Sequence, residues 1–87
     1  MNELTLYKKD STGAIRQWHI SVKENADGTG TINIESGLVD GQKVLQTLHI
    51  TEGKNIGRAN ETTPILQAHL EIQARINEQV KAGYVGN

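Results

Sequence analysis

Cationic and amide side chains gather in one short segment near the middle of the chain. Residues 54–60 contain Lys54, Asn55, Arg58 and Asn60 and follow directly on a glycine. Lysine and arginine neutralise phosphates, while asparagine side chains and glycine-flanked amides donate hydrogen bonds that fix position without reading base sequence. We therefore expect these four residues to contact phosphates, joined by Lys43 from a turn that precedes them. The alternative is a solvated polar loop with ordinary surface lysines.

Other chemistries lack their required spacing. The segment 53–58 resembles a phosphate loop but lacks the Gly-Lys-Ser/Thr ending, and residues 28–30 lack the third glycine of a dinucleotide fingerprint. His19, His49 and His69 stand at no metal-ligand spacing, and the chain has no cysteine. No serine has a nucleophile-elbow context, and the carboxylates show no pairing. The sequence thus predicts no catalytic residue, no metal site and no cofactor.

Length and charge limit the protein further. The 87 residues form one small domain, 1–87, and 10 acidic against 9 basic side chains exclude a polycation that coats nucleic acid by bulk charge. No apolar run approaches the roughly 18 to 20 residues that span a bilayer. The N-terminus lacks the basic start and apolar stretch of a signal peptide. We expect a soluble protein of a reducing, intracellular compartment, without a membrane partner.

Period-two alternation predicts four strands joined by glycine turns. We expect strands over 3–8, 15–23, 30–35 and 42–51, with Ser36-Gly37 ending the third and turns at 10–13, 25–28 and 40–41. The inward positions are Leu4, Leu6, Trp18, Ile20, Val22, Ile32, Ile34, Val44, Leu48 and Ile50. Leu45 fits neither face, which indicates a bulge or an edge position. His19 and His49 fall on the polar face.

A period of 3.6 follows the polar stretch 52–63. Thr63 and Pro64 are an N-cap and a first helical residue, and Gly83 is a stop after a helix that runs to about Ala82. The predicted apolar stripe contains Ile65, His69, Ile72, Ile76 and Val80. In that stripe we expect His69 to be a core histidine with a hydrogen bond. The fold class is therefore α+β, a twisted antiparallel sheet of about four strands with one C-terminal helix packed on one face.

Several motifs resemble the WGR domain, a small nucleic-acid-binding module of poly(ADP-ribose) polymerases. The closest likeness is to WGR-like segments of bacteriophage ATP-dependent DNA ligases. The matching motifs are Leu6-Tyr7-Lys8-Lys9-Asp10, Trp18, Gly37, Asp40-Gly41-Gln42, the long polar motif at 53–64, and Lys81-Ala82-Gly83-Tyr84. The resemblance implies duplex DNA, nicked or with ends, as the partner. It also implies that Gly37, Gly41 and Gln42 are turn positions that contact it.

The chain departs from that family at its name motif. Ser36 and Leu38 flank Gly37 where the family has tryptophan and arginine, so contacts would shift to Lys43, Lys54, Asn55 and Arg58. The lysine of a ligase Lys-x-Asp-Gly motif is also missing, since Asn25 and Leu38 stand at that position.

The resemblance therefore implies a noncatalytic DNA-binding accessory module. It would support phage DNA repair, ligation or replication in the cytoplasm of an infected bacterium, alone or beside a ligase. The alternative is a protein-interaction module that has lost DNA contacts. Such a module would bind a phage or host protein through a sheet edge or through the polar sheet face.

Overall fold

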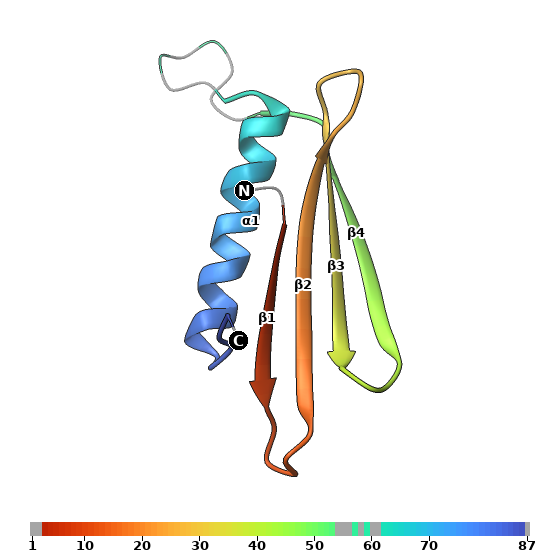
Figure 1. The fold of residues 1–87 in the computed structure, drawn as a ribbon. Helices are drawn as coiled ribbons and strands as arrows, with labels where there is room; N and C mark the ends of the chain where they lie inside the picture. The colour runs from red at the N-terminus through yellow and green to blue at the C-terminus, as the bar shows by residue number, and fades with distance from the viewer. Residues whose placement is uncertain (1–2, 54–56, 58, 60–61, 87) are drawn as a thin grey trace.

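The computed structural model of the 87-residue chain describes residues 3–53, 57, 59 and 62–86. These form the strands β1 (Glu3–Lys9), β2 (Ile15–Glu24), β3 (Gly30–Leu38) and β4 (Lys43–Ile50), followed by the helix α1 (Pro64–Lys81). The strands make one antiparallel sheet in the order β1-β2-β3-β4, and α1 lies across one of its faces (Figure 1). The predicted α+β class is confirmed.

The core lies between α1 and the covered face of the sheet. The register places Leu6 opposite Trp18, and Ile20 opposite Ile34, so that alternate residues of neighbouring strands meet on one face. The buried residues are Leu6, Trp18, Ile20, Val22, Ile32, Ile34, Ala68 and Ile72. Their aliphatic character follows from a sequence with few aromatics, and the opposite face is left open.

The third strand extends further than the glycine signal predicts. Ser36 and Gly37 lie inside β3, and Gly37 pairs with Lys43 at a φ of 152°. A β-carbon on Gly37 would stand 2.5 Å from the carbonyl oxygen of Gln42. The glycine thus permits the tight approach of β4 and does not end the strand. The expected turn position at Gly37 is wrong.

The covered face has one open corner, where the predicted burial of Val44 is wrong. Val44 is 71% exposed and pairs with Ser36, at the opposite end of the sheet from the contact of α1 with Gly30. The helix runs obliquely, and the Nζ of Lys8 in β1 donates a hydrogen bond to the carbonyl oxygen of Ala82 at 2.6 Å. The end of α1 is therefore drawn towards β1 and away from β4.

Leu45 is 65% exposed because it lies on the open face of the sheet, in the edge strand β4. The pairing of β4 with β3 runs without interruption from Gly30 opposite Ile50 to Gly37 opposite Lys43. A bulge would break this register, so of the two explanations for Leu45 only the edge position holds.

The helix begins and ends as its sequence signals predict. The hydroxyl of Thr63 accepts a hydrogen bond from the backbone nitrogen of Leu66 at 3.2 Å, and Pro64 is the first helical residue. Gly83 has a φ of 104° just beyond the end of the helix.

Two positions of the predicted stripe differ from expectation. Val80 is 53% exposed, since the oblique course of α1 carries its last turn off the core. His69 is half-buried beside Val22 and Ile65, at an open hollow, and makes no hydrogen bond with the described residues. The predicted core histidine with a hydrogen bond is therefore wrong.

The close packing of α1 against β3 leads to a stability prediction. A β-carbon on Gly30 would stand 2.7 Å from the β-carbon of Ala68, so Gly30→Ala must push the helix off the sheet. Overpacking of this kind costs about 1–3 kcal/mol of unfolding free energy. Urea unfolding of Gly30→Ala, Ala68→Gly and the double variant checks this, because the double variant should recover part of the loss. If the double variant instead lost the sum of the two single losses, the close contact of Gly30 with Ala68 would be contradicted.

Candidate nucleic-acid interface

The six predicted contact residues divide into two groups. Lys54, Asn55, Arg58 and Asn60 lie outside the described residues, whereas Gln42 and Lys43 are described. Gln42 is exposed in the turn between β3 and β4. Lys43 starts β4, and its Nζ donates to the carbonyl oxygen of Val39 at 3.1 Å. An ammonium has three donors, so two remain for a ligand.

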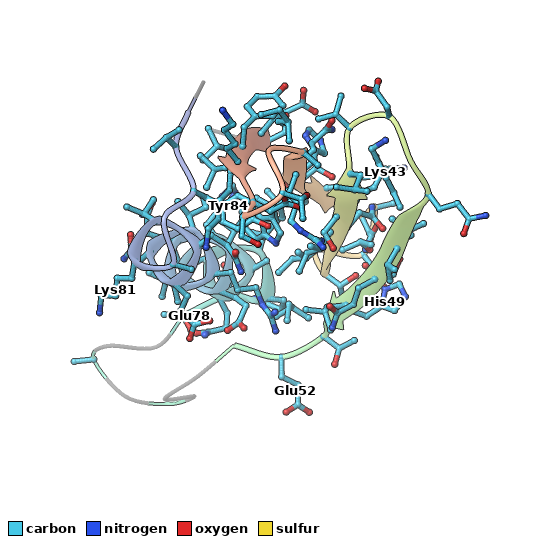
Figure 2. All side chains as sticks on the ribbon, turned by 90° about the horizontal axis from the view of Figure 1, so that it is seen from below. Lys43, His49, Glu52, Glu78, Lys81 and Tyr84 are labelled. Atoms are coloured by element: carbon cyan, nitrogen blue, oxygen red, sulfur yellow. The ribbon has the colours of Figure 1, made fainter. Side chains whose placement is uncertain are left out.

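The fold separates Lys43 from the polar segment at 52–63. Lys43 is the first residue of β4 and Ile50 is the last, so seven residue steps of about 3.4 Å, or about 24 Å, lie between them. Figure 2 shows Lys43 and His49 along β4, on the side of the molecule away from Lys81 and Glu78 of α1. Lys43 and Gln42 therefore cannot contact the same phosphate as a group held next to Gly53.

The two ends of the segment 53–62 touch each other. A β-carbon on Gly53 would overlap the carbonyl oxygen of Thr62 and stand 2.5 Å from the Thr62 carbonyl carbon. The hydroxyl of Thr62 in turn donates to the Oε1 of Gln67 at 3.2 Å. We call this close approach of Gly53 and Thr62 the neck. It fixes both ends of the segment at the start of α1.

The neck stands at the positive end of the helix dipole. The first backbone amides of a helix lack partners within the helix and carry partial positive charge. The first turn of α1 contains no acidic residue that would neutralise this charge. An anion bound next to the neck would therefore be stabilised by the helix.

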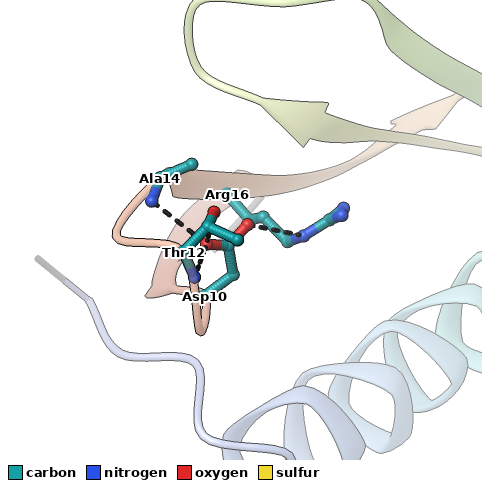
Figure 3. A network of polar contacts seen from close by, with 4 residues as sticks. All are labelled: Asp10, Thr12, Ala14 and Arg16. Carbon is teal, nitrogen blue, oxygen red and sulfur yellow. Dashed lines mark hydrogen bonds and ion pairs between the residues drawn. The ribbon is translucent and has the colours of Figure 1, made fainter.

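Lys8 and Arg16, two of the three basic residues around the first turn, are engaged within the fold. The Nε of Arg16 lies 3.8 Å from the Oδ2 of Asp10 (Figure 3), while Lys8 binds the end of α1 and lies 5.9 Å from the centre of the Tyr84 ring. Lys9 is exposed. Because two of its three cations already have partners within the fold, the cluster of Lys8, Lys9 and Arg16 is a weak candidate for phosphate binding.

Asp10 organises the first turn through three hydrogen bonds to its Oδ1. The donors are the backbone nitrogen of Thr12 at 2.9 Å, the Thr12 hydroxyl at 2.6 Å and the backbone nitrogen of Ala14 at 3.0 Å (Figure 3). The bond from the Thr12 hydroxyl is the largest cause that holds the pKa of Asp10 below its ordinary value. Asp27 and Thr29 repeat the arrangement in the second turn, where the Thr29 hydroxyl lowers the pKa of Asp27.

The repeated turn gives a prediction with an internal control. Thr12→Val removes the hydroxyl donor, so the pKa of Asp10 should rise towards 3.8 while the pKa of Asp27 stays unchanged. Because the folded pKa of Asp10 is depressed, its stabilising effect is present above the unfolded pKa and is lost as pH falls through the folded pKa. An NMR titration of both carboxyl groups measures this. An unchanged Asp10 midpoint would contradict the assigned cause.

A hollow that the sequence did not predict lies between the β1–β2 turn and the β3–β4 turn, at the end of the sheet opposite the neck. Its volume is about 500 Å³, and its lining residues are Tyr7, Gly13, Ala14, Ile15, Leu38, Val39, Asp40 and Gly41. Glycines from both turns leave the space, which no local pattern in either turn indicates. The lining is mostly apolar, with Asp40 as its one acidic residue.

The open face of the sheet carries cross-strand polar pairs. The Oγ1 of Thr5 lies 2.7 Å from the Nδ1 of His19, and the Thr47 hydroxyl donates to the Oδ1 of Asn33 at 2.9 Å. The predicted place of His19 and His49 on this face is confirmed, since Thr31 pairs with His49 in the register. In the described part of the chain, no group of three or more His, Asp or Glu side chains could hold a metal ion.

Comparison with known proteins adds no relative. No protein-family model, no curated protein and no solved structure matches this chain. Among the described residues, no helix is long and apolar enough to cross a membrane.

Proposed function

We propose that the protein is a noncatalytic DNA-binding accessory module that contacts phosphates through residues 54–60. The observation that carries the proposal is the neck, because Gly53 and Thr62 hold the ends of this cationic and amide-rich segment at the start of α1. Helix dipole and cationic side chains then act on the same anion. The resemblance to WGR-like ligase segments supports a role in phage DNA repair, ligation or replication, in the cytoplasm of an infected bacterium.

Lys43 and Gln42 have a different part in this proposal. They lie at the far end of β4, about 24 Å from Ile50, so they would contact phosphates further along a duplex, where that length corresponds to about seven base pairs at about 3.4 Å each. The distance favours a duplex that lies along the sheet over a single phosphate held in a pocket. Nicked or end-containing duplex DNA offers both the length and the phosphates.

The experiment compares two variants with equal loss of charge. Lys54→Ala/Arg58→Ala removes two cations from the proposed contact, and Lys9→Ala/Lys81→Ala removes two exposed cations from the far end of the domain. Binding to a labelled nicked duplex is measured at several salt concentrations. The first variant should reduce the steepness of log affinity against log salt by about 1.8, since each phosphate contact contributes about 0.9. Equal effects of both variants would reject residues 54–60 as the contact.

A second candidate function is protein interaction in place of DNA binding. The observation that favours it is β4, whose outer edge is unpaired among the described residues and carries exposed Val44 and Leu45. Partner strands add readily to such an edge. A pull-down from host lysate treated with nuclease distinguishes the two functions, because a partner retained after DNA digestion owes nothing to DNA.

A further inference from the structure

The two edges of the sheet are unequally protected. At β1, Val85 pairs with Tyr7 through two backbone hydrogen bonds of 2.8 Å, and the strand carries Glu3, Lys8 and Lys9. Covering segments and charged side chains are the usual means by which proteins prevent sheets from joining edge to edge. The sheet therefore has a protected edge at β1.

At β4, the described residues include no covering segment, and the one charged side chain is Lys43 at the start of the strand. The strand has eight residues, its register with β3 is unbroken, and after Lys43 it reads Val-Leu-Gln-Thr-Leu-His-Ile, without a proline or a formal charge at neutral pH. Val44 is 71% exposed on the face that α1 covers, and Leu45 is 65% exposed on the open face. An unbroken edge that is uncharged from Val44 to Ile50 and carries apolar side chains on both faces is a template for another strand.

From this edge we infer that β4 pairs antiparallel with β4 of a second copy of the chain, around a two-fold axis at Gln46. A two-fold dimer uses the same surface on both partners, so the strand must be complementary to itself. In this register Val44 faces Leu48 of the second copy on both sides of the axis, and the two Gln46 amides face each other. On the open face, Leu45 stands opposite Thr47.

The inferred register extends the existing core. Leu48 is half-buried and packs against the core, while Val44 lies in the corner that α1 leaves open. Each Val44 would cover the Leu48 of the other copy, and cross-strand apolar pairs of this kind stabilise a sheet. Moving the two-fold axis by one residue, to Thr47, shifts the pairing by two residues and sets Gln46 against Leu48, a polar side chain against an apolar one.

Charge does not oppose the pairing. Lys43, the one charged side chain of β4, stands opposite His49 of the second copy, and the two Lys43 residues lie at opposite ends of the paired strands. The formal charge of the chain is only −1, so repulsion between copies is small. The pairing joins the two sheets edge to edge, so it leaves the open sheet face uncovered, and it requires no DNA.

Light scattering of nuclease-treated protein, at concentrations from micromolar to millimolar, tests the dimer. We expect a concentration-dependent dimer whose dissociation constant rises about tenfold or more in Val44→Lys, because two symmetry-related pairs are lost together. Leu66→Lys is the matched control, since Leu66 is an exposed apolar residue of α1, away from the edge. A monomer at every concentration would overturn the inference, as would a dimer that only Leu66→Lys weakens.

A disulfide test fixes the register. The chain has no cysteine. In Gln46→Cys the two cysteines would stand directly opposite each other, with their Cα atoms about 4.5–5.5 Å apart, a separation that permits a disulfide. In His49→Cys the two thiols would stand six residue positions apart, about 20 Å. Mild oxidation should therefore link Gln46→Cys and leave His49→Cys unlinked. Equal linkage of both variants, or linkage of His49→Cys alone, would reject the pairing about Gln46.

Discussion

Trp18→Ala should lower the free energy of unfolding by about 3–5 kcal/mol, the cost of removing a large buried ring from a core. Trp18 is 5% exposed, and its strand neighbours in the register are Leu6 and Ser36. The small Ser36 leaves the ring to fill the space on that side of the core. Since domains are stable by only about 5–15 kcal/mol, the variant should be partly or wholly unfolded at 37 °C.

Urea unfolding followed by far-ultraviolet circular dichroism measures this loss, because Trp18 is the only tryptophan and its fluorescence is absent from the variant. Gln17→Ala, one residue away on the open face, is the matched control and should change stability by less than about 0.5 kcal/mol. A Trp18→Ala protein as stable as the control would contradict the buried position of the ring.

Gly53→Ala should both destabilise the domain and weaken DNA binding. The added methyl group would overlap the carbonyl oxygen of Thr62, and backbone cannot move aside as the end of a flexible side chain can. The neck must open, at a cost of about 1–3 kcal/mol. The ends of segment 53–62 would then leave the start of α1, so affinity for duplex DNA should fall at constant salt.

Gly86→Ala is the control for Gly53→Ala, because a β-carbon at Gly86 would meet no atom within 4 Å. Urea unfolding and DNA titration of both variants separate the two effects. Normal stability in Gly53→Ala would contradict the closed neck. Reduced stability with unchanged DNA affinity would show that the neck serves the fold and not the contact.

Local patterns in the sequence determine most of the sheet and the helix. The alternation of Trp18, Ile20 and Val22 with polar residues gives the buried face of β2, and Gly28 has a φ of 84° as its Asp-Gly turn requires. Thr63 caps α1 as predicted. Each of these signals acts over a few residues, so no knowledge of distant contacts is needed to predict its effect.

Local sequence patterns do not predict features that depend on a contact between elements far apart in the chain. Val44 and Val80 have apolar patterns that match their neighbours, yet both are exposed because α1 crosses the sheet obliquely. That course depends on the contact of Gly30 with Ala68 and on the hydrogen bond from Lys8 to Ala82, which join segments far apart in the chain. Gly37 likewise resembles a turn residue until the position of Gln42 is known.

The candidate site was predicted in part. The residue types at 54–60 indicated phosphate contacts, but the neck between Gly53 and Thr62 has no local signature, since it depends on where β4 ends and α1 begins. The separation of Lys43 from the neck follows from the length of β4, whose two ends lie about 24 Å apart.

The salt dependence of wild-type binding tests the proposed function most directly. Affinity for a nicked duplex is measured by fluorescence anisotropy across a series of salt concentrations, with blunt duplex and single-stranded DNA for comparison. Contact with three to five phosphates predicts that log affinity falls against log salt with a slope of about −3 to −4.5 on duplex DNA. Absence of binding at low salt, or binding that does not change with salt, would contradict a module that holds DNA through its phosphates.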